Sequence, residues 1–147
     1  LLDETEPGLL EAVQATEKAS FYGFEVVRNE LKRIPPNKKK AGRNYRSLAL
    51  KLYDELVRGH AFEVTPLIGV LADAYARAFR DNRAARKLHN DFLIVACASF
   101  HGLDVLVSDD RRTLSSTASR AAYGSVNGKN YLRTPCFYAI RDLKELV

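Results

Sequence analysis

The sequence predicts an α/β fold, with three α/β/α layers and a central parallel sheet. Helical and strand-like patterns alternate along the chain, as they do in folds of this class. The run Leu103–Val107 is apolar at most positions, which is typical of a parallel strand covered on both faces. The chain has 147 residues and is 46% hydrophobic, so residues 1–147 are expected to form a single domain.

The N-terminal third is expected to contain two helical segments and one strand. Apolar residues at helical spacing predict a helix over Glu6–Lys18. A strand is expected at Phe21–Val27, and Glu30 follows it at the start of a short helical segment. Pro35 and Pro36 end that segment, because proline disfavours helical geometry in the residue before it.

The middle of the chain continues the alternation. After a basic loop at 37–43, Asn44 is expected to cap a helix that ends near Gly59. A strand is expected at Ala61–Val64. Thr65 and Pro66 then open a helix of about Leu67–Arg80, whose apolar stripe is expected to comprise Leu67, Leu71, Ala74, Tyr75 and Ala78.

The C-terminal half contains the most informative stretch, Leu88–Asp110. An apolar helix that ends at Gly102 precedes the apolar strand, and each carries carboxylates at one end. The remaining elements are expected to be a helix from Arg111 to about Ala122, a loop at Gly124–Asn130, a strand at Pro135–Ile140 and a short helix to Val147.

Three acids occupy similar predicted positions, at the carboxyl end of a strand or in the first turn of a helix: Glu30, Asp91 and Asp110. Carboxylates that converge repel one another unless a cation neutralises them, so the pattern favours a divalent metal. Oxygen ligands favour Mg²⁺ or Mn²⁺ over zinc. Taken singly, Asp91 is also typical of a helix cap, Asp110 of a turn, and Glu30 of an ion pair with a neighbouring base.

The net charge of +5 is concentrated in one segment. Eight basic residues and one acid lie between Arg28 and Arg46. Such a cluster attracts polyanions, although a lysine run is also typical of a solvated surface. The residues expected to contact nucleic acid are Lys38, Lys39, Lys40, Arg43, Arg111 and Arg112.

Cysteine and hydropathy favour a cytoplasmic protein. Cys97 and Cys136 lie in apolar contexts without metal-ligand spacing, and they are expected to be buried thiols. No apolar run approaches the ~20 residues that cross a bilayer, so no membrane partner is expected.

These residues resemble the pattern of PIN domains, which are metal-dependent nucleases that include the VapC toxins. The resemblance rests on Glu30-Leu31 after a strand, on Asn90–Ala96 and on Leu106–Asp110, and it spans roughly Glu6–Val147. It implies a parallel sheet flanked by helices and an RNA substrate, single-stranded or structured. It also implies an antitoxin partner for toxin members, and a homodimer.

The resemblance implies roles for individual residues. Glu30, Asp91 and Asp110 would be the metal-site acids, Asp109 would add a ligand, and Ser108 would hold the site by hydrogen bonding. The family's first acid follows an N-terminal strand, whereas this chain begins Leu1-Leu2-Asp3. Two alternatives therefore stay open: Asp3 is the first ligand, or Asp3 belongs to a loop and cap and the native N-terminal strand lies upstream.

Two classes of function follow. The first is a Mg²⁺- or Mn²⁺-dependent endoribonuclease, with the toxin of a toxin-antitoxin pair as one form of it. The second is a non-catalytic RNA-binding or scaffold module with an incomplete metal site. The sequence is equally compatible with DNA as the nucleic acid.

Overall fold

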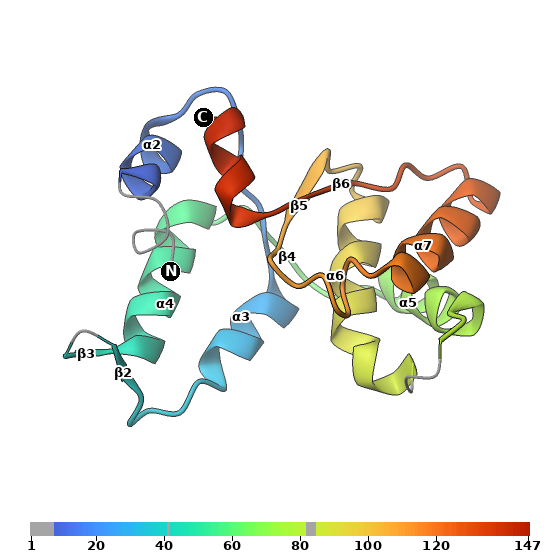
Figure 1. Ribbon diagram of the computed structural model, residues 1–147, viewed down its shortest axis with the longest axis horizontal. Helices are drawn as coiled ribbons and strands as arrows, with labels where there is room; N and C mark the ends of the chain where they lie inside the picture. The colour runs from blue at the N-terminus through green and yellow to red at the C-terminus, as the bar shows by residue number, and fades with distance from the viewer. Residues whose placement is uncertain (1–7, 41, 82–84) are drawn as a thin grey trace. The chain divides into compact units, whose positions relative to one another are not determined.

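The computed structural model describes residues 8–40, 42–81 and 85–147 and divides the chain into two compact units (Figure 1). Unit 1 comprises Leu1–Glu63 and Leu143–Val147, and unit 2 comprises Val64–Asp142. Helices alternate with short strands, and two of the three sheets are parallel pairs. The α/β class is confirmed, while a three-layer arrangement around one central sheet stays a prediction.

The described residues of unit 1 form two parallel-paired strands, a short hairpin and three α-helices. Strand β1 (Gly23–Phe24) pairs with β4 (Ala61–Phe62), and the helix α3 (Glu25–Lys32) packs against α4 (Tyr45–Val57). The helix α2 (Leu9–Ala15) precedes them. Between α3 and α4, the strands β2 (Lys39–Lys40) and β3 (Arg43–Asn44) form an antiparallel hairpin inside the predicted basic loop.

The strand predicted at Phe21–Val27 is much shorter in the structure. Only Gly23 and Phe24 are extended, and Glu25 begins α3 directly afterwards. A carboxylate in a first helical turn interacts favourably with the positive end of the helix dipole, and the helix buries Val26. The helix predicted over Glu6–Lys18 is also shorter, and its first two positions lie outside the described residues.

The predicted helix caps are confirmed. The Asn44 side chain accepts a hydrogen bond from Ser47 N (3.0 Å), and Thr65 Oγ1 accepts one from Ile68 N (3.3 Å). Both bonds satisfy amide groups that have no partner within the first helical turn. The helix α4 ends at the predicted place, with Gly59 at φ +82°.

The described residues of unit 2 form three α-helices and a second parallel strand pair, labelled in Figure 1. The helix α5 (Pro66–Ala78) packs against α6 (His89–Phe100) and α7 (Thr117–Lys129). Strand β5 (Val105–Val107) pairs in parallel with β6 (Cys136–Tyr138). Two 3₁₀ segments complete the chain: η1 (Ala85–Leu88) before α6, and η2 (Ile140–Glu145) after β6.

The predicted apolar stripe of α5 is partly wrong. Leu67 is 62% exposed, whereas Ile68, Leu71 and Tyr75 are buried. The sequence pattern fits a stripe that includes either Leu67 or Ile68, because both are apolar. Contact with α6 and α7 decides between them, since these helices cover the face of α5 that carries Ile68.

The end of unit 2 corrects a second prediction. The helix expected at Arg111–Ala122 begins only at Thr117, and it continues through the segment expected to be a loop. Ser116 caps it by accepting a hydrogen bond from Ser119 N (3.2 Å). Each helical glycine costs about 1 kcal/mol relative to alanine, but burial of Tyr123, Val126 and Asn127 on one face outweighs this cost.

Aromatic side chains form the centre of unit 2. Tyr75, Phe92 and Tyr123 are fully buried, and their rings meet edge to face with centroids 4.9–6.4 Å apart. Such geometry places the positive ring edge against the negative face of a neighbour. None of the helices within the described ranges is long and apolar enough to cross a membrane.

Candidate functional site

Asp91 lies in the first turn of α6, as predicted. The following residues of α6 are almost all buried, including Phe92, Leu93 and Val95. They anchor the helix in the core, and the half-buried Asp91 side chain lies where the helix leaves it. The positive end of the helix dipole favours a carboxylate at this position.

Asp110 lies three residues after β5 and organises the loop that follows. Its Oδ1 accepts hydrogen bonds from Arg112 N (3.0 Å) and Thr113 N (2.9 Å), and the Thr113 hydroxyl donates to Oδ2. These bonds lower the pKa of Asp110, the Thr113 hydroxyl contributing most. The carboxylate is therefore ionised at neutral pH, and it has the geometry of a turn cap.

Ser108 lies directly after β5, and its proposed support of a metal site stays a prediction. Its amide donates to Tyr138 O (2.9 Å), which extends the β5–β6 ladder by one bond. Its hydroxyl accepts a hydrogen bond from Asp110 N (3.1 Å). Ser108 thus connects the sheet to the loop that carries Asp110.

Asp109 joins the loop after β5 to the chain after β6. Its Oδ1 accepts a hydrogen bond from Ile140 N (2.9 Å), the first residue of η2. This oxygen therefore holds the chain after β6, which is a structural role. The expectation that Asp109 adds a metal ligand remains a prediction.

Tyr123 is bonded to the loop that follows Asp110. Its phenol is fully buried and donates to Leu114 O (2.7 Å), within the loop after Asp110. Burial raises the pKa of Tyr123, and the carboxylates of Asp91 and Asp110 both raise it further. Sequence patterns missed Tyr123, since a tyrosine at helical spacing is usually a core residue.

The loop after Asp110 is held to α7 by several further bonds. Ser119 Oγ donates to Thr113 O (2.6 Å), and Ser115 Oγ donates to Asp110 O (2.9 Å). Arg120 Nε donates to Ser115 O (3.0 Å). The serine-rich segment before and within α7 therefore holds the Asp110 loop in place, in addition to the bonds that the Asp110 carboxylate itself accepts.

These residues fit a divalent cation in kind. Carboxylate oxygens are the ligands that Mg²⁺ and Mn²⁺ prefer, and unit 2 contains both Asp91 and Asp110. Across the described ranges, however, no group of three or more histidine, cysteine, aspartate or glutamate side chains is positioned to hold a metal ion. Asp3, the candidate first ligand, lies outside the described residues.

Glu30 departs from its predicted position. It lies in the second turn of α3, because the helix begins at Glu25 and not after a strand that reaches Val27. Its side chain is exposed, and it belongs to unit 1, whereas Asp91 and Asp110 belong to unit 2. The placement of Glu30 just past the end of a strand is therefore wrong.

The predicted basic residues of unit 1 gather around the β2–β3 hairpin. Lys38, Lys39 and Arg43 are exposed, and the backbone of Lys40 pairs with that of Arg43. Lys38 Nζ lies 5.3 Å from the centre of the Tyr45 ring. The hairpin therefore presents cations at its surface, as a phosphate-binding segment requires.

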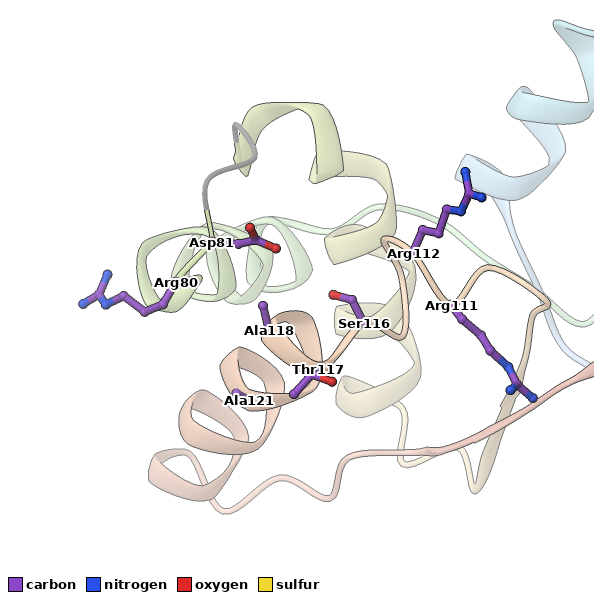
Figure 2. Close-up of a pocket in the computed structure, with 8 residues that line it drawn as sticks. All are labelled: Arg80, Asp81, Arg111, Arg112, Ser116, Thr117, Ala118 and Ala121. Carbon is purple, nitrogen blue, oxygen red and sulfur yellow. The ribbon is translucent and has the colours of Figure 1, made fainter.

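Arg111 and Arg112 line a depression of about 710 Å³ in unit 2 (Figure 2). Its other cation is Arg80, its acid is Asp81, and Ala118 and Ala121 of α7 are part of its wall. The Arg111 and Arg112 side chains diverge, and Arg80 extends from the opposite side (Figure 2). The depression is basic, but its lining includes neither Asp91 nor Asp110.

The two cysteines differ in their surroundings. Cys97 is buried in α6, as predicted, whereas Cys136 at the start of β6 is exposed. The prediction of a buried thiol is therefore wrong for Cys136, whose side chain lies at the end of the two-stranded sheet.

Comparison with protein-family models, with curated proteins and with solved structures finds no match to this chain.

Proposed function

We propose that this chain is a Mg²⁺- or Mn²⁺-dependent endoribonuclease of the PIN-domain kind, with Asp91 and Asp110 among its metal-site acids. The observation that carries the proposal is the buried Tyr123 phenol, which donates to Leu114 O in the Asp110 loop and whose pKa both carboxylates raise. The proposal includes a three-layer α/β/α arrangement, Glu30 as a third acid and Asp109 as an added ligand. It also includes an antitoxin partner and a homodimer.

The chemistry of the two acids suits phosphodiester hydrolysis. Asp110 is ionised because its loop donates hydrogen bonds to it, and Asp91 lies at a helix N-terminus that favours a negative charge. A divalent ion bound by them would activate water and stabilise the charge that develops on the phosphate. The arginines after Asp110 and the β2–β3 hairpin would bind the RNA backbone.

Cleavage of end-labelled single-stranded RNA in Mn²⁺ tests this proposal. We expect wild type to cleave, EDTA to abolish cleavage, and Asp91→Asn to lower the rate at least about 100-fold, as loss of a group that stabilises developing charge does. Asp73→Asn is the matched control, because Asp73 is an exposed acid of α5 in the same unit. A DNA strand of the same sequence decides between the two nucleic acids. Undiminished cleavage by Asp91→Asn would refute the assignment.

A second candidate function is a non-catalytic RNA-binding module. It is favoured by the absence of a three-acid group in the described ranges and by the bonds that already engage both Asp110 oxygens. Calorimetry separates the two candidates. Salt-sensitive RNA binding without heat of binding at millimolar Mn²⁺ would support the module.

A further inference from the structure

Arg120 is held in place by two contacts that sequence patterns do not reveal. Its guanidinium carbon lies 5.0 Å from the centre of the Phe137 ring on β6, and its Nε donates to Ser115 O (3.0 Å). The side chain is nevertheless exposed. A guanidinium with one fixed nitrogen and one covered face has lost much of its rotational freedom before any ligand binds.

The remaining two nitrogens of Arg120 distinguish it from Arg28 and Arg133. The Arg28 guanidinium is bonded to Asp54, and that of Arg133 is bonded to Asp104 and Gly102 O. For Arg120, the described part of the chain supplies only the Ser115 carbonyl and the Phe137 ring. Its charge is therefore not neutralised by any described carboxylate, and its terminal nitrogens keep the fork geometry that matches a phosphate.

Arg120 is also connected to the residues around Asp110. Ser115, which accepts its hydrogen bond, donates both its amide (3.2 Å) and its hydroxyl (2.9 Å) to Asp110 O. Phe137, which its guanidinium covers, stacks on Tyr123 with ring centres 5.9 Å apart. Every one of these residues belongs to unit 2. Arg120 thus contacts Ser115, which is bonded to Asp110 O, and it contacts Phe137, which stacks on Tyr123.

We propose that Arg120 is a substrate-binding residue that binds a backbone phosphate of RNA next to the Asp110 loop. This inference rests on the proposed function for the identity of the anion. The bidentate fork would bind two oxygens of one phosphate, while Phe137 and Ser115 O keep the guanidinium plane fixed. Arg111 and Arg112 diverge from each other, and they would supply longer-range attraction.

Fluorescence anisotropy with a short labelled single-stranded RNA in EDTA tests the inference without cleavage. Arg120→Gln is expected to weaken binding about tenfold at low salt, the usual size for a lost hydrogen bond to a charged group. The slope of log affinity against log salt is expected to fall by roughly 0.7, as for one lost phosphate contact on a single strand. Arg77→Gln is the matched control, because it removes an exposed charge from α5 of the same unit.

Arg120→Lys separates charge from geometry. Lysine keeps the charge but has neither the planar fork nor the Nε donor, so we expect the wild-type salt slope with only partial recovery of affinity. This variant also carries the test if Arg120→Gln fails to fold, as judged from its melting curve. Wild-type affinity and slope in Arg120→Gln, or full rescue of affinity by Arg120→Lys, would overturn the inference.

Cleavage assays keep this inference distinct from the proposed nuclease activity. If wild type binds RNA through Arg120 but does not cleave in Mn²⁺, the nuclease assignment fails and the Arg120 contact stands. If wild type cleaves, Arg120→Gln is expected to raise KM more than it lowers kcat. Unchanged kcat and KM in Arg120→Gln would refute the contact and leave the nuclease assignment intact.

Discussion

Tyr75 donates a hydrogen bond of 2.6 Å to Asn127 Oδ1, between α5 and α7, where both side chains are buried. The Tyr75 phenol also lies 3.2 Å from Ser99 Oγ on α6. The Asn127 amide donates to Ser99 Oγ (3.0 Å) and to Thr134 Oγ1 (2.9 Å). The three helices of unit 2 are therefore joined by one closed polar network as well as by aromatic packing.

Removal of the Tyr75 hydroxyl is expected to destabilise the protein. Tyr75→Phe leaves Asn127 Oδ1 buried without its donor, which costs about 1–3 kcal/mol in the free energy of unfolding. Tyr22→Phe is the control, because the Tyr22 side chain is exposed and its ring stacking on Phe62 is kept. Urea unfolding measures both variants, and equal free energies would contradict the role of the network.

Predictions from the sequence were accurate where local residues decide the structure. Asn44 and Thr65 cap their helices because a short polar side chain bonds an amide three residues ahead. The positions of Asp91 and Asp110 were likewise predictable, since each is determined by the element beside it. The predicted loop at Gly124–Asn130 was wrong, because burial against α5 stabilises the helix despite its glycines.

The candidate site also includes features that long-range contacts decide. Arg120 was not identified as a candidate, because its position depends on Phe137, which follows seventeen residues later and belongs to a different element. Tyr123 was missed for the same reason, since its bond to Leu114 O and its neighbours Asp91 and Asp110 appear only in the folded chain. Periodicity cannot report contacts of this kind.

Gly23 is expected to tolerate no side chain. A Cβ there would meet the Tyr53 hydroxyl and lie 2.8 Å from Val57 Cγ2, and the Tyr53 hydroxyl is bonded to Phe24 O. Gly23→Ala should therefore destabilise the protein by about 1–3 kcal/mol, as overpacking does. Thermal or urea unfolding of the purified variant measures this.

Gly69 supplies the matched control for Gly23. It lies inside α5, and a Cβ there would have no atom within 4 Å. Gly69→Ala should stabilise the protein by about 0.5–1 kcal/mol, because alanine loses less backbone entropy in a helix. A loss of stability in both variants would show that the close approach at β1 is not the cause.

The two cysteines should react at very different rates. Burial raises the pKa of the Cys97 thiol to about 12, so it stays protonated at pH 8, and the thiolate is the reactive form. Cys136 is exposed. DTNB at pH 8 should therefore modify Cys136 in the native protein and reach Cys97 only after unfolding. Rapid reaction of Cys136→Ser under native conditions would contradict this assignment.

Two substitutions separate the structural role of Asp110 from its proposed role in metal binding. Asp110→Asn keeps an oxygen that can accept the amides of Arg112 and Thr113, so it should fold and lose only the contribution of the carboxylate charge. Asp110→Ala loses the cap and should cost about 1 kcal/mol. Mn²⁺ titration by calorimetry should show loss of binding in both variants, whereas a purely structural role would spare Asp110→Asn.

The pH dependence of stability gives an independent measure of the Asp110 cap. Because the folded pKa lies below the unfolded value of about 3.9, the ionised carboxylate stabilises the fold above that value. That contribution is lost as pH falls from about 4 through the lowered folded pKa. The difference in unfolding free energy between wild type and Asp110→Asn should therefore be constant between pH 5 and pH 7 and should shrink below pH 4. A difference that does not change on acidification would mean that the Asp110 charge contributes nothing to the loop.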